Sequence, residues 1–183
     1  FGTGLKFAIA TILRGGGSVT LYRGTDEHRF GTSRQSVRGQ DFDIITLDGQ
    51  ELGFTTALGR DWKPWMAFRE LACNALDEGG RDYSARDLEG PFDADETVFA
   101  VHSEEIEDAY HSRGSIILES EPDHANEFIE IRKGSSGEVY YRGVNVGRCL
   151  HSTSHTYNIL RKIDLTEDRT AKYNFQVMDQ ISK

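Results

Sequence analysis

The sequence predicts an α+β fold: a two-layer α/β sandwich in which a mixed, mostly antiparallel sheet carries helices on one face. Two long segments, residues 4–14 and 61–77, repeat apolar residues at the spacing of an amphipathic helix. Short runs rich in β-branched and aromatic residues lie between and after them. Because no repeat and no linker-like tract interrupts the chain, we expect one domain over residues 1–183. The chain begins at Phe1 instead of Met, so we expect a piece of a longer protein.

The first half of the chain is expected to form a helix, an antiparallel meander and a second helix. The glycines at residues 15–17 end the first helix, residues 4–14. The second helix, residues 61–77, has Pro64 near its start, where proline is tolerated. The strands expected between the two helices cover residues 18–22, 28–32, 42–47 and 52–56.

The second half of the chain alternates strands with polar connections. Residues 81–95 are polar and acidic and predict a surface loop. A short acidic helix is expected over residues 103–111, and a last helix over residues 166–182, with Thr166 or Asp168 as its N-cap. The expected strands cover residues 97–102, 115–119, 128–132, 138–141 and 144–146, with the Gly134–Gly137 segment joining the third to the fourth as a hairpin.

The composition excludes several classes of protein. The chain has 21 lysine and arginine residues against 30 aspartate and glutamate residues, a formal charge of −9. This acidic balance argues against direct nucleic-acid binding through phosphate contacts. No apolar stretch approaches the length of about 18 residues that predicts a membrane span. Two cysteines, Cys73 and Cys149, are too few for a disulfide framework, so we expect a reducing cytoplasm.

The 19 glycines are unusual beside only 3 prolines, and two of them begin a candidate phosphate loop. In FGTGLK, Gly2 and Gly4 directly precede a helix, whose backbone N–H groups and positive end suit a phosphate. Lys6 adds a positive charge in the first turn. The alternative is an ordinary turn at the start of a helix. The third glycine of the dinucleotide fingerprint and the Gly-Lys-Ser/Thr ending of the P-loop are both absent.

A second candidate motif lies in RELACNALD, on the second helix. Glu70, Asn74 and Asp77 follow one another at i, i+4 and i+7, which places them in one line along the helix. The amide oxygen of Asn74 is a hard ligand for Mg²⁺, and Glu70 could orient or deprotonate a water molecule. The alternative is a solvated helix face. Asn74 is the residue that this alternative explains least well, because asparagine is a poor helix former.

Together the two motifs resemble the GHKL ATPase superfamily, which contains gyrase B subunits, ninety-kilodalton heat-shock chaperones, sensor histidine kinases and MutL. The resemblance implies the Bergerat fold, a layered α/β sandwich, with ATP and Mg²⁺ as ligands. It implies that Asn74 is the Mg²⁺ ligand and that Glu70 is the general base for the attacking water. The residues that it implies for nucleotide binding are Gly2, Thr3, Gly4, Leu5, Lys6, Asn74 and Asp77.

The chain departs from that superfamily in two ways. The Glu/Asn helix here follows the glycine motif, so the fold is expected to be a circular permutation, which is possible where termini lie close together. The adenine-reading Asp-x-Gly-x-Gly loop has no clear counterpart: residues 143–147, GVNVG, lack the Asp, and Asp77 or Glu104 are the alternatives. The segments FTTALG and LTEDRT are also similar to uncharacterised phage-type proteins.

Other polar residues have simpler interpretations. His151 and His155 could be two metal ligands, but the intervening Ser and Thr residues favour a strand or loop. Ser152 with one of these histidines lacks a nucleophile-elbow pattern. Cys73 is expected to be a small core residue, because its neighbours are apolar.

The sequence therefore predicts an ATP-binding protein, and a Mg²⁺-dependent ATPase gated by a lid or by dimerisation. The lid could lie before Phe1 or in residues 81–95. The expected partners are ATP or ADP and a protein partner or second copy, with no direct nucleic acid and no membrane. The alternative is an acidic protein-interaction module, such as a phage-encoded regulator of a host protein, acting in the host cytoplasm.

Overall fold

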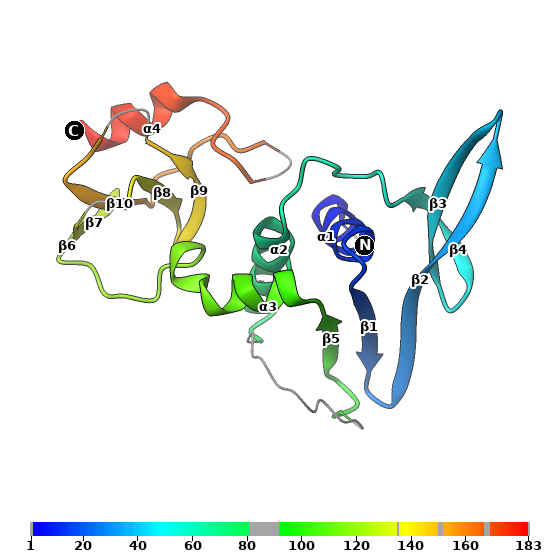
Figure 1. The fold of residues 1–183 in the computed structure, drawn as a ribbon. Coiled ribbons are helices and arrows are strands. Elements are labelled where there is room, and N and C mark those ends of the chain that lie inside the picture. The colour runs from blue at the N-terminus through cyan, green and yellow to red at the C-terminus, as the bar shows by residue number, and fades with distance from the viewer. Residues whose placement is uncertain (1, 81–91, 135, 150–151, 167–168, 183) are drawn as a thin grey trace. The chain divides into compact units, whose positions relative to one another are not determined.

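A computed structural model describes residues 2–80, 92–134, 136–149, 152–166 and 169–182. Over these residues the chain has an α+β fold with four α-helices and two mostly antiparallel sheets, as the sequence predicts (Figure 1). Contacts divide the chain into two compact units, Phe1–His111 and Ser112–Lys183. Each unit is described by itself. The expectation of one GHKL-like domain over the whole chain stays a prediction.

The first unit contains a five-stranded antiparallel sheet in the order β4-β3-β2-β1-β5. The four strands of the meander are neighbours in sequence order, and β5 joins the free edge of β1. The elements are α1 (Thr3–Arg14), β1 (Ser18–Arg23), β2 (Asp26–Val37), β3 (Gln40–Leu47), β4 (Gln50–Thr55), α2 (Pro64–Asp77), β5 (Thr97–His102) and α3 (Glu104–His111).

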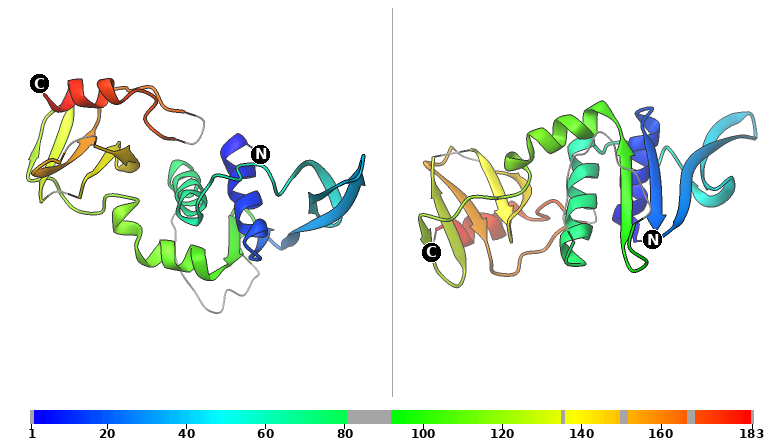
Figure 2. Two further views of the ribbon diagram at one scale, coloured as in Figure 1. Left: turned by 45° about the horizontal axis from the view of Figure 1, so that its top comes forward. Right: turned by 90° about the horizontal axis from the view of Figure 1, so that it is seen from below.

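Helix α1 is the centre of the first unit. It contacts β1 and β2 on one side and α2 on the other, and α2 in turn contacts α3 (Figures 1 and 2). Ala8, Ile9 and Ala10 are completely buried, because α1 is covered on two sides. This explains why its apolar stripe is wide: a helix between two layers buries more of its circumference than a surface helix.

The β2–β3 hairpin is longer than the sequence predicts. The backbone ladder runs without a break from Phe30 opposite Leu47 to Val37 opposite Gln40. Its turn, Arg38–Gly39, has positive φ at both residues (53° and 78°), the geometry that matches the twist of the paired strands. The apolar alternation fades toward the tip, so the pattern alone underestimates the length.

The connection between β4 and α2 is held against α1 by one side chain. Arg14 donates hydrogen bonds to the carbonyl oxygens of Thr56, Leu58 and Gly59, at 2.6, 3.1 and 3.0 Å. Within the same connection Trp62 is buried and packs edge-on against Phe7, with ring centroids 5.1 Å apart. Helix α2 begins at Pro64, three residues later than predicted, because this connection is extended and anchored on α1.

The second unit has a smaller five-stranded sheet in the order β6-β7-β10-β8-β9. All its pairs are antiparallel except β10 with β8, which is parallel. Val139, Val146, Ile159, Ile163 and Val177 form its core. The elements are β6 (His124–Ala125), β7 (Ile129–Lys133), β8 (Glu138–Tyr141), β9 (Val144–Arg148), β10 (His155–Ile159) and α4 (Asn174–Ile181), after a short 3-10 turn, Arg113–Ser115.

Two strand predictions in the second unit are wrong. Residues 115–119 are not a strand: Ser115 ends a 3-10 turn, and Ile117 makes only an isolated antiparallel bridge with Val144. The Ser115 carbonyl accepts hydrogen bonds from the Tyr140 hydroxyl and the Asn145 amide. Strands β7 and β8 are joined in sequence but do not pair, because the unpredicted strand β10 lies between them. The polar residue Asn158 interrupts the apolar pattern of β10, so the pattern does not indicate a strand there. Its side chain accepts a hydrogen bond from the Gly143 amide and donates one to Glu130.

The last helix is also shorter than predicted. It covers Asn174–Ile181, not residues 166–182. Thr166 is not an N-cap: its hydroxyl donates to the Thr170 carbonyl and accepts from the Thr170 amide, closing a turn before the helix. The other predicted cap, Asp168, lies outside the described residues.

Stability is expected to depend on pH through Asp48, at the β3–β4 turn. The hydrogen bond with His28 (2.7 Å) and the Arg29 backbone N–H (2.8 Å) hold the pKa of the Asp48 carboxyl below its ordinary value. A lowered folded pKa means that this contribution is complete above the ordinary value of about 4 and is lost as pH falls through the folded pKa.

Chemical unfolding of the wild type and Asp48→Asn at a series of pH values checks this. The stability difference in favour of the wild type should shrink as the pH falls below about 4. The variant Asp61→Asn is the control for the loss of one exposed carboxylate elsewhere in the first unit. A difference for Asp48→Asn that is constant down to pH 2 would contradict the assignment.

Candidate functional site

The two sequence motifs meet where the start of α1 lies against the middle of α2. A Cβ atom added to Gly4 would lie 2.2 Å from Oε1 and 2.9 Å from Oε2 of Glu70, so a side chain there cannot coexist with this carboxylate position. Glu70 is buried, with 7% of its surface exposed. Because Gly4 has no side chain, the Glu70 carboxylate of α2 can lie against the N-terminus of α1.

The start of α1 is built to receive a negative charge. Gly2 is the N-cap in an extended conformation and has no side chain that could cap the helix, and the first turn contains no acidic residue. The first backbone N–H groups of a helix have no partner within it, and the helix dipole adds a partial positive charge there. A carboxylate or a phosphate at this point receives both contributions.

Asn74 completes the arrangement one helical turn after Glu70. Its Nδ2 donates a hydrogen bond to Oε1 of Glu70 at 3.3 Å. With Nδ2 used in this way, the Oδ1 atom of Asn74 is available for a cation, and the side chain is only half-buried. A carboxylate beside an amide oxygen is a donor set that suits Mg²⁺, which usually takes one or two protein oxygens plus phosphate and water.

The remaining predicted residues are not all drawn together. The Lys6 ammonium lies over the Phe54 ring of β4, 5.9 Å from its centroid, so its contact with a phosphate stays a prediction. Thr3 is exposed and Leu5 half-buried in the first turn of α1. Asp77 is exposed in the last turn of α2, one turn beyond Asn74.

The alternatives for reading adenine are spread over the chain. Glu104 is the exposed first residue of α3. The 143–147 segment belongs to the β8–β9 hairpin of the second unit, where Gly143 has a φ of 84° and its amide donates to Asn158. No counterpart of the adenine-reading loop is therefore assigned among the described residues.

The simpler interpretations fit the described residues. Cys73 is buried in α2 with 4% of its surface exposed, as expected of a core residue. His155 begins β10, and its Nδ1 lies 2.8 Å from the Ser154 hydroxyl. His151 lies outside the described residues.

The sequence patterns did not single out two arginines that lie on the two helices of the site. Arg69 precedes Glu70, is only 1% exposed, and its guanidinium lies 5.0 Å from the centre of the Trp65 ring. The i, i+4 spacing of Trp65 and Arg69 was the available signal. The hydrogen bonds of Arg14 could not be predicted from local patterns, because the carbonyl groups that it binds lie more than forty residues away in the sequence.

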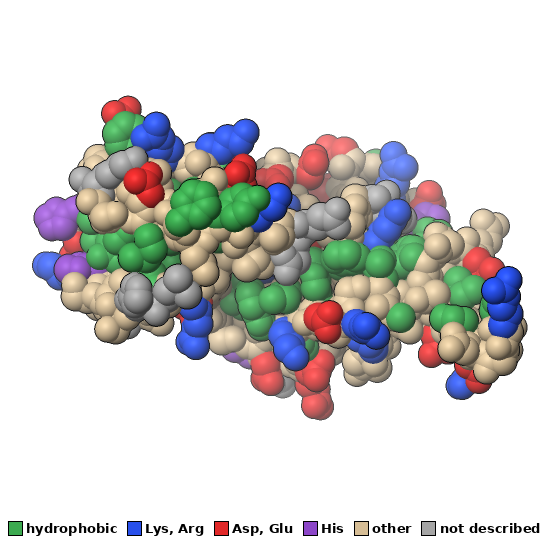
Figure 3. Space-filling model, turned by 90° about the horizontal axis from the view of Figure 1, so that it is seen from above, with side chains coloured by type: hydrophobic (Ala, Val, Ile, Leu, Met, Phe, Trp, Pro, Cys, Tyr) green, Lys and Arg blue, Asp and Glu red, His purple; other side chains and the backbone are tan. Residues whose placement is uncertain are grey.

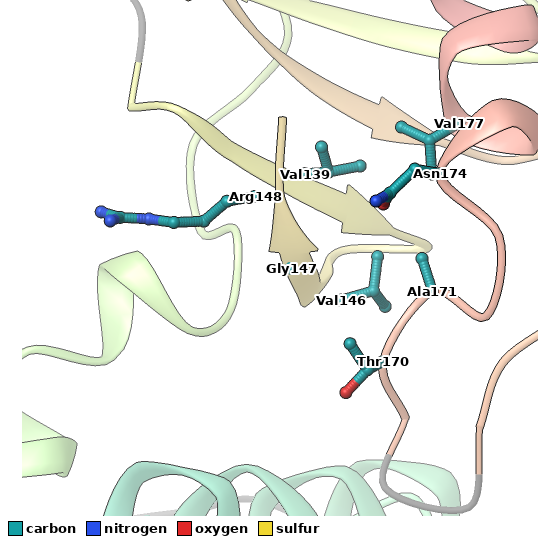
Figure 4. A pocket seen from close by; sticks show the side chains of 8 residues that line it. All are labelled: Val139, Val146, Gly147, Arg148, Thr170, Ala171, Asn174 and Val177. Atoms are coloured by element: carbon teal, nitrogen blue, oxygen red, sulfur yellow. The ribbon is translucent and has the colours of Figure 1, made fainter. Parts of the chain in front are cut away.

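A shallow pocket elsewhere does not suit a nucleotide. It lies in the second unit between β8, β9 and α4, has a volume of about 80 Å³, and is lined mostly by small and apolar residues (Figure 4). Ligand pockets for molecules of nucleotide size span hundreds of cubic ångströms. Figure 4 also shows Arg148 extending away from the pocket, where its Nε pairs with Glu138 at 2.6 Å.

Within the described residues, no three His, Cys, Asp or Glu side chains gather as a metal-binding group. None of the described helices combines the length and apolarity that crossing a membrane requires. Comparison with known proteins found no matching family model, no matching curated protein and no matching solved structure.

Gly4→Ala should displace the Glu70 carboxylate without unfolding the chain. Alanine is the better helix former by about 1 kcal/mol, and the group that must move is the end of a flexible side chain. The Asn74 side-chain amide resonances should therefore shift while the thermal midpoint stays near the wild-type value. Gly2→Ala is the matched control, since a Cβ atom there meets nothing within 4 Å. Equal shifts in both variants would contradict the close approach.

Proposed function

We propose that the first unit binds ATP with Mg²⁺ and hydrolyses it, as a circularly permuted relative of the GHKL ATPases. The observation that carries the proposal is the close approach of Gly4 to the Glu70 carboxylate, which brings the glycine motif and the Glu/Asn helix to one place. Packing of α1 on α2 would bring the two helices together in any case, but the approach of Gly4 to the Glu70 carboxylate pairs the two motifs residue by residue.

The residues present divide the chemistry between them. The uncapped start of α1 offers backbone N–H groups to the phosphates. Asn74 would hold Mg²⁺ through Oδ1, and the cation would neutralise charge on the polyphosphate. Glu70, fixed by its hydrogen bond from Asn74, can accept the proton of a water that attacks the terminal phosphate.

The buried carboxylate also explains why the cation is needed. Glu70 and a polyphosphate carry the same sign of charge, and both are drawn to the start of α1. Without a divalent cation the phosphate would be repelled at short range, where screening by solvent is weak. Nucleotide affinity is therefore expected to depend steeply on Mg²⁺.

Titration calorimetry with ATP and ADP, with Mg²⁺ or with EDTA, tests binding. The wild type should bind in the millimolar range or tighter only with Mg²⁺, and Asn74→Ala should weaken binding about tenfold. Absence of any affinity for either nucleotide would overturn the proposal. Glu78→Gln is the matched control, because Glu78 is an exposed acid at the end of the same helix.

Phosphate release separates hydrolysis from binding. Glu70→Gln keeps the shape of the side chain and removes the base, so kcat should fall about 100-fold or more while nucleotide affinity stays equal or becomes tighter. Parallel loss of binding and turnover would remove Glu70 from the role of base. Activity should be measured over a range of protein concentrations, because gating by a second copy would make kcat concentration-dependent.

A second candidate function is an acidic protein-interaction module. The first unit carries 11 lysine and arginine residues against 20 aspartate and glutamate residues, so the whole formal charge of −9 lies there. In α3, Glu104, Glu105, Glu107 and Asp108 are all exposed. A basic partner captured at low salt and released at high salt, without nucleotide, would favour this function.

A further inference from the structure

The second unit exposes more aromatic surface than its size requires. Phe175 is 68% exposed, Phe128 43% and Tyr173 41%, which makes them three of the most exposed large apolar side chains in the described part of the chain. Single exposed apolar residues are common on protein surfaces. Groups of exposed aromatic side chains accompanied by charged groups are less common, and they indicate a surface that binds a ligand or partner.

These aromatic rings are organised and paired with cations. Tyr173 and Phe175 face each other with ring centroids 5.5 Å apart and planes inclined by 32°. The Lys172 ammonium lies 5.3 Å from the centroid of Tyr173, and the Arg161 guanidinium lies 5.3 Å from that of Phe128. We call Phe128, Arg161, Lys172, Tyr173 and Phe175 the aromatic–cation face.

Hydrogen bonds connect the two halves of this face. The backbone amide of Arg161 donates to the Phe128 carbonyl, and that of Lys172 donates to the Asp164 carbonyl. Three residues of extended chain, from Arg161 to Asp164, span at most about 11 Å. The backbone segments that carry the two aromatic–cation pairs are thus close together. Figure 3, which looks onto the side that carries α4, shows large hydrophobic side chains standing beside a basic one.

The face carries cations beside its aromatic rings although the chain is acidic. The second unit carries 10 lysine and arginine residues against 10 aspartate and glutamate residues, so it has no net charge. Arg161 and Lys172 are exposed, while Asp164 accepts a hydrogen bond from Gln176. The other exposed acids in the sequence around the face are Glu127, directly before Phe128, and Asp179, one turn after Phe175 on α4. The expectation of no nucleic-acid partner rests on the whole-chain charge, which belongs to the first unit.

We propose that the aromatic–cation face binds single-stranded nucleic acid. Bases would stack on the exposed rings of Tyr173 and Phe175, with Phe128 as a further stacking point. Lys172 and Arg161, each already held over a ring, would meet the phosphates that join those bases. A duplex hides its base faces and would gain only the few cation contacts. An apolar partner would be served by aliphatic side chains and would not need a cation beside each aromatic group.

Fluorescence anisotropy with a labelled oligothymidine of about 20 nucleotides, at low salt, tests the proposal. The full chain should bind it, and a duplex of equal length should compete poorly. Phe175→Ala and Phe175→Leu should each weaken binding about tenfold, because both remove the aromatic ring. Lys172→Gln should weaken it and reduce the slope of log K against log salt by about 0.7. Asp179→Asn should tighten it.

Two exposed positions of the first unit give matched controls. Val37→Ala removes apolar surface that is 51% exposed, and Arg60→Gln removes an exposed charge; neither should change the affinity. Phe175 is mostly solvent-exposed, so its variants should fold, which circular dichroism checks.

Several results would overturn the proposal. One is no binding by the wild type at low salt, and another is equal affinity for duplex and single strand. Wild-type affinity in Phe175→Leu would indicate apolar contact in place of stacking. A wild-type dimer in sedimentation velocity that Phe175→Ala dissociates would assign the face to a second copy.

Discussion

The close approach of Gly4 of α1 to the Glu70 carboxylate of α2 is the constraint on which the candidate site depends. A Cβ atom at position 4 would lie 2.2 Å from Oε1 of Glu70, so the position of this carboxylate requires the absence of a side chain there. The carboxylate gains the positive end of α1, and α1 gains an anion at an otherwise uncapped N-terminus. The glycine motif therefore supplies the positive end of a helix, and the Glu/Asn helix supplies a negative charge beside it.

The rest of the first unit keeps that contact in place. Helix α1 is covered by β1 and β2 on one side and by α2 on the other. At its far end Arg14 holds the carbonyl oxygens of the connection that leads into α2, and Trp62 in that connection packs on Phe7. Because contacts hold α1 along its length, they also fix the direction of α2. The positions of Glu70 and Asn74 depend on that direction.

The two units differ in the kind of surface that they present. The first carries the entire formal charge of −9, so a polyphosphate bound there as proposed would need a local cradle and a cation to offset that charge. The second is neutral and exposes aromatic rings beside lysine and arginine. The net charge of the whole chain describes neither surface, because contacts between exposed charges act only over about a Debye length.

Local spacing and turn residues were enough to predict the fold class, the two helices of the candidate site and most strands of the first sheet. They also singled out Gly4, Glu70 and Asn74 as candidate site residues, which lie close together in the structure, and Cys73 as a core residue. The insertion of β10 between β7 and β8, the late start of α4 and the contacts of Arg14 depend on tertiary structure. In each case polar side chains such as Asn158, Thr166 and Arg14 satisfy backbone groups distant in sequence or outside regular elements, and periodicity carries no signal for such contacts.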